Sequence, residues 1–65
     1  MTWMPVAEDL PREGLPVLVT YRDMYGDLAV TAARWRKGQW IVDDYGILET
    51  VRAWMRLPRP YTGES

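Results

Sequence analysis

Residues 16–22 read P-V-L-V-T-Y-R, and residues 28–37 read L-A-V-T-A-A-R-W-R-K. In the first run, Val17, Val19 and Tyr21 fall on one face at a period of two, which is the side-chain alternation of a β-strand. The second run contains three alanines that would also suit a helix, but its apolar residues form no helical stripe. Gly26 lies between the runs and suits a turn. We therefore predict two antiparallel strands joined by a turn at residues 24–27.

Two further strands are expected beyond residue 37. Residues 36–39, R-K-G-Q, lie between Trp35 and Trp40 and are typical of a tight hairpin turn, in which Gly38 can adopt a positive φ. Residues 39–43 should therefore pair with the preceding strand. From residue 50 the chain alternates again as T-V-R-A-W-M-R-L, until Pro58 ends the strand.

The predicted fold is mainly β, with an α+β fold as the alternative: a small antiparallel sheet of three to four strands. The apolar face of this sheet needs a cover, and the N-terminal segment, residues 2–15, is the material left to provide it. Residues 7–10 could form one helical turn there, but Pro5, Pro11 and Gly14 leave no room for a longer helix. We expect a single small domain over residues 1–65, with residues 61–65 as a flexible tail.

The composition argues against several classes of function. The chain has 65 residues with no cysteine and no histidine, so a disulfide framework and the usual zinc, haem and iron–sulfur ligand sets are missing. The same absences remove the commonest general base and the best ordinary nucleophile. We therefore expect a protein that is not an enzyme and that has no catalytic residues, cofactor, metal or small-molecule substrate.

The apolar stretches are short. The first residues reach Glu8 and Asp9 almost at once, and the longest apolar stretch, residues 15–19, is interrupted by Pro16. Neither pattern is that of a signal peptide or a membrane helix. We expect a cytoplasmic protein with no membrane partner.

Three motifs together resemble a known family. They are W-M-P-V at residues 3–6 with L-P-x-x-G-x-x-V-L-V at 10–19, W-x-x-G-x-W at 35–40, and W-M-R-L-P-x-P at 54–60. They resemble the domain-of-unknown-function 551 family, small proteins found mostly in phages and prophages that end in W-M-P-L-P-x-P. Here Arg56 stands where the family has proline. The family has no assigned chemistry, so the resemblance implies a context, a small phage-borne accessory protein in the host cytoplasm, rather than an activity.

Carboxylates gather in the predicted loops, whereas most basic residues lie on the predicted strands. The loop carboxylates that we single out as a candidate partner-binding rim are Asp23, Asp27, Asp43, Asp44 and Glu49. Such a rim could engage the basic groove of a nucleic-acid-binding protein by imitating phosphates. The alternative is that these turns are simply solvated and use Asp for local backbone hydrogen bonds.

A second candidate surface is basic and aromatic. Arg52, Trp54 and Arg56 alternate onto one face of the last predicted strand and could stack on bases or on an aromatic group of a partner. The alternative is that Trp54 covers one side of the sheet and the arginine stems pack beside it. For the core, we expect at least three of four bulky residues to be buried: Trp3, Met4, Trp40 and Met55.

Three classes of function remain. The favoured one is a phage-encoded inhibitor, of the anti-CRISPR type, that binds a host defence protein such as a CRISPR effector subunit and blocks its nucleic-acid-binding surface. The second is a self-associating module, for example a homodimer, whose exposed edge strand pairs with another copy or with a phage structural protein. The third is a direct nucleic-acid binder, which a net charge of -1 disfavours.

Overall fold

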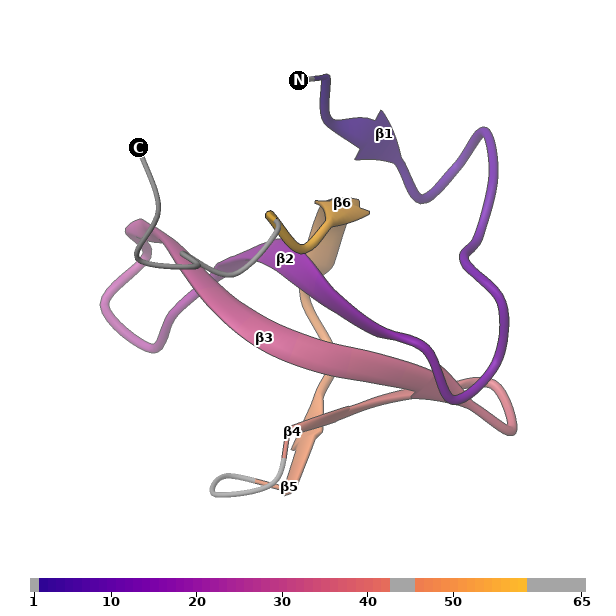
Figure 1. Ribbon diagram of the computed structural model, residues 1–65. Coiled ribbons are helices and arrows are strands. Elements are labelled where there is room, and N and C mark those ends of the chain that lie inside the picture. Colours follow the sequence, from indigo (N-terminus) through magenta and orange to yellow (C-terminus); the bar gives the residue numbers. More distant parts are fainter. Residues whose placement is uncertain (1, 43–45, 59–65) are drawn as a thin grey trace, which may run out of the picture.

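The computed structural model describes residues 2–42 and 46–58, which form one open antiparallel sheet of six strands (Figure 1). The strands are β1 (Met4–Pro5), β2 (Pro16–Arg22), β3 (Leu28–Arg36), β4 (Gln39–Val42), β5 (Gly46–Leu48) and β6 (Val51–Arg56). Their order across the sheet is β1-β6-β2-β3-β4-β5. The mainly β prediction and the strands near 16–22, 28–37, 39–43 and 50–57 are confirmed. The predicted tail, residues 61–65, lies outside the described residues.

The prediction of three to four strands was wrong, because β1 and β5 add to the sheet. β1 pairs with β6, with Met4 opposite Trp54, and β5 pairs with β4, with Ile47 opposite Ile41. The N-terminal segment therefore contributes an edge strand rather than only a cover. A strand of two or three residues carries too little alternation to be recognised in sequence.

The α+β alternative is not what the structure shows, because no helix occurs in residues 2–42 or 46–58. Where one helical turn was considered, the chain forms an isolated turn instead. The N–H groups of Glu8 and Asp9 donate to the Pro5 carbonyl at 3.0 and 3.3 Å. Within this described part of the chain there is accordingly no helix long and apolar enough to cross a membrane.

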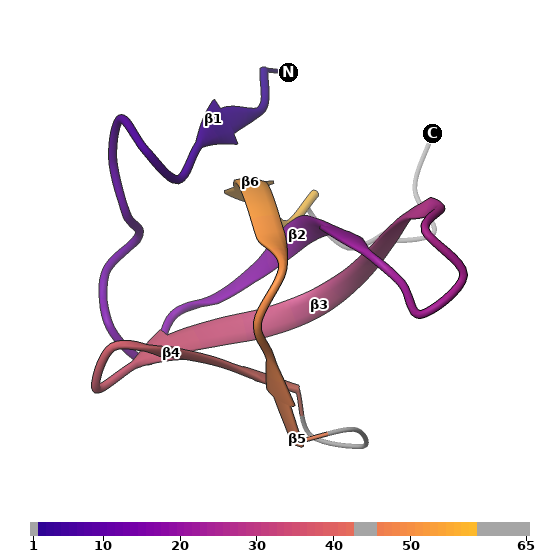
Figure 2. The ribbon, with the colours of Figure 1, turned by 180° about the vertical axis from the view of Figure 1, so that it is seen from behind.

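The sheet is strongly curled. Only residues 49–50 separate β5 from β6, yet β5 pairs with β4 while β6 pairs with β2 on the other side of β3. Figure 2 shows the chain crossing β3 on its way from β5 to β6. The curl brings β6 and β5 toward each other, and the concave side of the sheet encloses the core.

That core is built from the central strands. Its buried members are Val17, Val19, Ala33, Trp40 and Val42. Val17 pairs with Ala33 across to β3, so their side chains share the inner face. Partly buried residues from the other segments pack against this group: Val6, Trp35, Leu48, Val51 and Trp54.

The expected set of bulky core residues was largely wrong. Of the four, Trp40 is buried, and its ring lies 5.1 Å from that of Trp35 at an angle of 55°. Trp3 and Met4 are exposed because they belong to the edge of the sheet around β1. Met55 pairs with Leu18, whose neighbours Val17 and Val19 point inward, so Met55 faces outward.

The β3–β4 hairpin forms as predicted. Lys37 and Gly38 both have positive φ, 51° and 76°, which identifies a type I′ turn. The Lys37 amide also donates to a carboxylate oxygen of Glu13 at 2.6 Å. The N-terminal segment is thereby tied to the hairpin.

The same substitution on the two faces of the sheet tests the register. Val19 is fully buried and Val30 is 57% exposed. Val19→Ala should lower the free energy of unfolding by about 2 kcal/mol, because it leaves a cavity as well as losing apolar burial. Val30→Ala should lower it by less than about 1 kcal/mol, the span of strand propensity. Urea denaturation of both variants measures this, and equal losses would contradict the assignment of faces.

Candidate protein interface at the β2–β3 turn

The turn between β2 and β3, residues 23–27, is held by its own hydrogen bonds. The Asp23 amide donates to the Asp27 carbonyl at 2.8 Å, and the Gly26 amide donates to the Asp23 carbonyl at 3.0 Å. One carboxylate oxygen of Asp23 accepts the amides of Tyr25 and Asp27, both at 2.9 Å. The guanidinium of Arg22, the last residue of β2, also donates to the Gly26 carbonyl. The turn therefore has a defined shape rather than that of a loose loop.

This ordered turn presents two large side chains to water. Met24 is 89% exposed and Tyr25 is 82% exposed, the highest values among the exposed large apolar side chains. We call Met24 and Tyr25 the tip. Neighbouring large apolar side chains that are this exposed make the tip a candidate for a surface that a partner covers. Tyr is also enriched in interfaces, and the flexible thioether of Met adapts to irregular partner surfaces.

The base of the turn is tied to the corner between β5 and β6. The Thr50 hydroxyl donates to the Arg22 carbonyl at 2.7 Å, and the Arg22 amide lies 3.4 Å from the Thr50 carbonyl that accepts it. These bonds place Glu49 at the same end of the sheet as the turn. A shallow, largely apolar hollow at this corner is lined by Tyr21, Arg22, Asp23, Met24, Tyr25 and Leu48. Glu49 itself lines a different hollow, together with Trp35 and Trp40.

In the described part of the chain, acidic residues lie outside the strands, whereas most basic residues lie on them. None of the six strands contains an Asp or Glu, whereas five strand positions carry arginine: Arg22, Arg34, Arg36, Arg52 and Arg56. At the turn end of the sheet the exposed carboxylates are Asp27 and Glu49. The nearby Arg22 guanidinium is engaged with the turn backbone. With Asp23, three carboxylates at this end outnumber the single guanidinium of Arg22, so its net charge is negative.

The structure brings together part of the predicted acidic rim. Asp23, Asp27 and Glu49 lie at one end of the sheet, but the Asp23 carboxylate is used inside its own turn. This is the local role that was considered as the alternative. Asp43 and Asp44 lie outside the described residues. The partner-binding role of all five residues stays a prediction.

The three residues of the basic and aromatic candidate do not form one surface. Trp54 pairs with the buried Val19 and packs against the core, and its indole N–H donates to the Asp9 carbonyl at 3.0 Å. Arg52 falls at a β-bulge that shifts the register between Thr20 and Tyr21. Arg56 is exposed at the far end of β6. The indole is thus engaged by the N-terminal segment.

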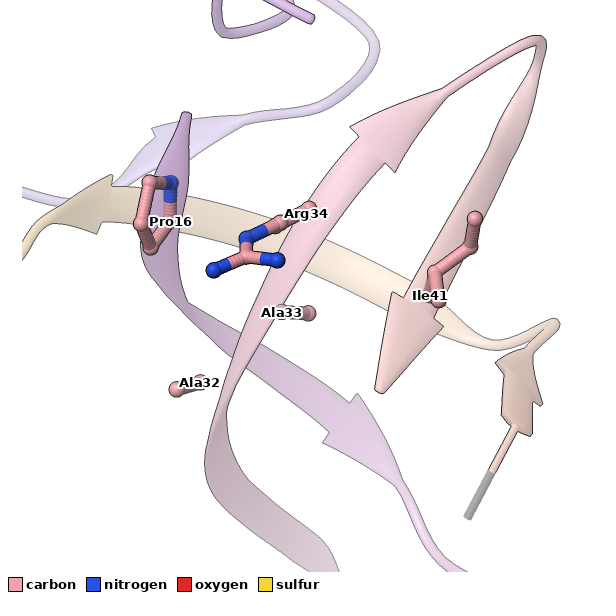
Figure 3. Close-up of a pocket in the computed structure, with 5 residues that line it drawn as sticks. All are labelled: Pro16, Ala32, Ala33, Arg34 and Ile41. Atoms are coloured by element: carbon pink, nitrogen blue, oxygen red, sulfur yellow. The ribbon is translucent and has the colours of Figure 1, made fainter. Parts of the chain in front are cut away.

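A second hollow lies on the outer face, between β2, β3 and β4. Its lining residues are Pro16, Ala32, Ala33, Arg34 and Ile41, and Arg34 extends from β3 toward Pro16 (Figure 3). This lining provides one cation and no carboxylate, so it contains no acid–base pair. In the described part of the chain, no three acidic side chains come together as metal ligands would.

Met24 and Tyr25 were not among the candidate residues singled out from the sequence. The signal was present, because a turn between an Asp and a Gly normally carries polar residues. Two large apolar residues at that position, M-Y between Asp23 and Gly26, contradict this expectation.

Comparison with known proteins identifies the family. Residues 2–62 match the model of the family described as "Protein of unknown function (DUF551)". The chain belongs to the DUF551 family. No curated protein and no solved structure matches it. The resemblance in the tryptophan and proline motifs is therefore confirmed as DUF551 membership, which by itself assigns no activity.

The order of the turn can be tested at Asp23. Asp23→Ala removes the acceptor of two backbone amides and should lower the free energy of unfolding by about 1 kcal/mol. Hydrogen exchange of the Tyr25 and Asp27 amides should accelerate with it. Asp27→Ala is the matched control, because Asp27 contributes only backbone groups to the bonds of the turn. Equal effects of the two substitutions would refute the role given to the Asp23 carboxylate.

Proposed function

We propose that the protein is a phage-encoded, non-enzymatic inhibitor that binds a host defence protein, such as a CRISPR effector, in the host cytoplasm. In this proposal it covers the basic surface on which that protein holds nucleic acid. The single observation that carries the proposal is the tip, where Met24 and Tyr25 stand almost fully exposed on a hydrogen-bonded turn. The phage context rests on the motifs that resemble the family.

The ordered turn favours binding because little conformational freedom is left to lose. Side-chain and loop ordering normally offsets much of the gain from an interface. Here the hydrogen bonds of Asp23 fix the backbone beneath the tip before any partner arrives. Tyr25 can then enter an apolar pocket as an anchor, and Met24 can adapt to the rim of that pocket.

The charge around the tip favours a basic partner. Asp23, Asp27 and Glu49 lie at this end of the sheet and outnumber its one cation, Arg22. Carboxylates in this arrangement attract a positively charged surface at long range and accelerate association. Nucleic acid would be repelled by the same carboxylates, because phosphate neutralisation dominates its affinity for proteins. The favoured partner is therefore a protein that itself binds nucleic acid.

Cleavage of target DNA by a purified CRISPR effector with its guide RNA tests the proposal. The protein should inhibit cleavage, and Tyr25→Ala should weaken inhibition by about tenfold or more, as expected for the loss of an interface anchor. Asp27→Asn combined with Glu49→Gln should slow association mainly at low salt, because salt screens the attraction.

The control for the tip is Leu57→Ser, which removes an exposed apolar side chain just beyond the opposite end of β6. It should inhibit as the unaltered protein does, and thermal melts should show that every variant is folded. Unchanged inhibition by folded Tyr25→Ala would exclude the tip as the docking surface. Failure of the unaltered protein to inhibit effectors from the host's CRISPR types would reject the inhibitor function.

A further inference from the structure

β3 is paired with β2 over seven of its nine residues but with β4 over only three. Toward β2, its partners run from Leu28 opposite Arg22 to Arg34 opposite Pro16. Toward β4, the ladder covers Arg34 to Arg36 alone. In the described part of the chain, residues 28–32 have no strand on the β4 side. Figure 1 shows β4 leaving β3 as the sheet curls.

The type I′ hairpin fixes which backbone groups face this open edge. In a two-residue hairpin the residues that flank the turn, Arg36 and Gln39, form a hydrogen-bonded pair. The backbone groups of Arg36 therefore point toward β4, and so do those of every second residue before it. By this alternation the N–H and C=O groups of Leu28, Val30 and Ala32 point toward the open edge. Those of Ala29 and Thr31 point toward β2.

The outermost strands of the sheet offer no comparable edge. β1 is two residues long and includes Pro5, which lacks an N–H, and β5 is three residues long. The open edge of β3 is longer and reads L-A-V-T-A, with no charge, proline or glycine. Leu28 and Val30 are 60% and 57% exposed on the outer face beside it. An edge of this kind lacks the usual protection against pairing with another chain.

This edge is complementary to itself. In an antiparallel pair centred on Val30, each Leu28 lies opposite Ala32 of the other copy, and each Ala29 lies opposite Thr31. Every facing pair joins uncharged residues. The N–H and C=O groups of Leu28, Val30 and Ala32 that point to the open edge bond to those of Ala32, Val30 and Leu28, respectively, of the second copy. The exposed Leu28 and Val30 side chains of the two copies would then form one apolar row.

We propose that two copies of the protein pair antiparallel through residues 28–32 of β3, with Val30 opposite Val30 of the second copy. The occupant of the edge is a second copy because its self-matched register satisfies all the open backbone groups without placing a charge in the contact. The contact is small for a stable dimer, so the dissociation constant should lie at roughly 0.1 to 1 mM. This inference is independent of the proposed inhibitor function, since it concerns a different surface.

Amide hydrogen exchange and sedimentation of the full chain test this pairing over roughly 0.01 to 1 mM protein. In dilute solution the amides of Leu28, Val30 and Ala32 should exchange fast, while those of Ala29 and Thr31, bonded to β2, exchange slowly. At about 1 mM roughly half to four-fifths of the chains should be in dimers, so the weight-average mass should rise to about 1.5 to 1.8 times that of the monomer, and exchange of the three fast amides should slow about two- to fivefold.

Val30→Lys supplies the discriminating variant. It places two ammonium groups opposite each other at the centre of the contact and should weaken dimerisation by at least about tenfold. Its side chain is exposed in the single copy, so the fold should persist. Ile47→Lys, at a similarly exposed apolar position on β5, is the matched control and should dimerise normally.

Three results would overturn the proposal. A monomer at every concentration, with the three amides still exchanging fast, means that no second copy binds. Protection of these amides already in dilute solution means that the chain itself covers the edge. A dimer that survives Val30→Lys uses another surface.

Discussion

The central strand β2 is bonded on both sides, and this pairing organises the rest of the sheet. Its inward residues Val17 and Val19 are the two fully buried side chains of the described core. Because β3 and β6 must both keep their apolar residues against these valines, their registers are fixed relative to each other. That alignment places the β2–β3 turn beside the corner at residues 49–50. The candidate interface at the β2–β3 turn therefore depends on the burial of Val17 and Val19, which aligns the turn with the corner at residues 49–50.

Much of this fold could be predicted from the sequence where a pattern was long enough to show a period. The runs at 16–22 and 28–37 alternate clearly, and the Lys37–Gly38 pair has the chemistry of a tight hairpin. β1 and β5 could not be predicted, because strands of two or three residues are set by what they pair with rather than by their own alternation. Their positions in the sheet depend on pairing with β6 and β4, respectively.

The candidate site was only partly predictable for related reasons. Alternation alone says which residues of β6 share a face, but not which face is inward, and the bulge opposite Thr20 and Tyr21 interrupts even the alternation. Trp54 accordingly lies on the core. The acidic residues at 23, 27 and 49 could be found as loop residues, whereas their convergence depends on the Thr50–Arg22 hydrogen bonds. The exposure of Met24 and Tyr25 is a property of the folded turn.

The hairpin at the other end of β3 has a practical consequence for handling the molecule. Lys37 is the chain's sole lysine, and it sits on a turn fixed by its own backbone conformation and by Glu13. β3 spans nine residues between that turn and the tip, a separation of about 30 Å along an extended strand. Apart from the terminal amine, amine-reactive chemistry therefore addresses a single position. A fluorophore or a sensor surface coupled there would leave the end that carries Tyr25 directed away from the attachment point.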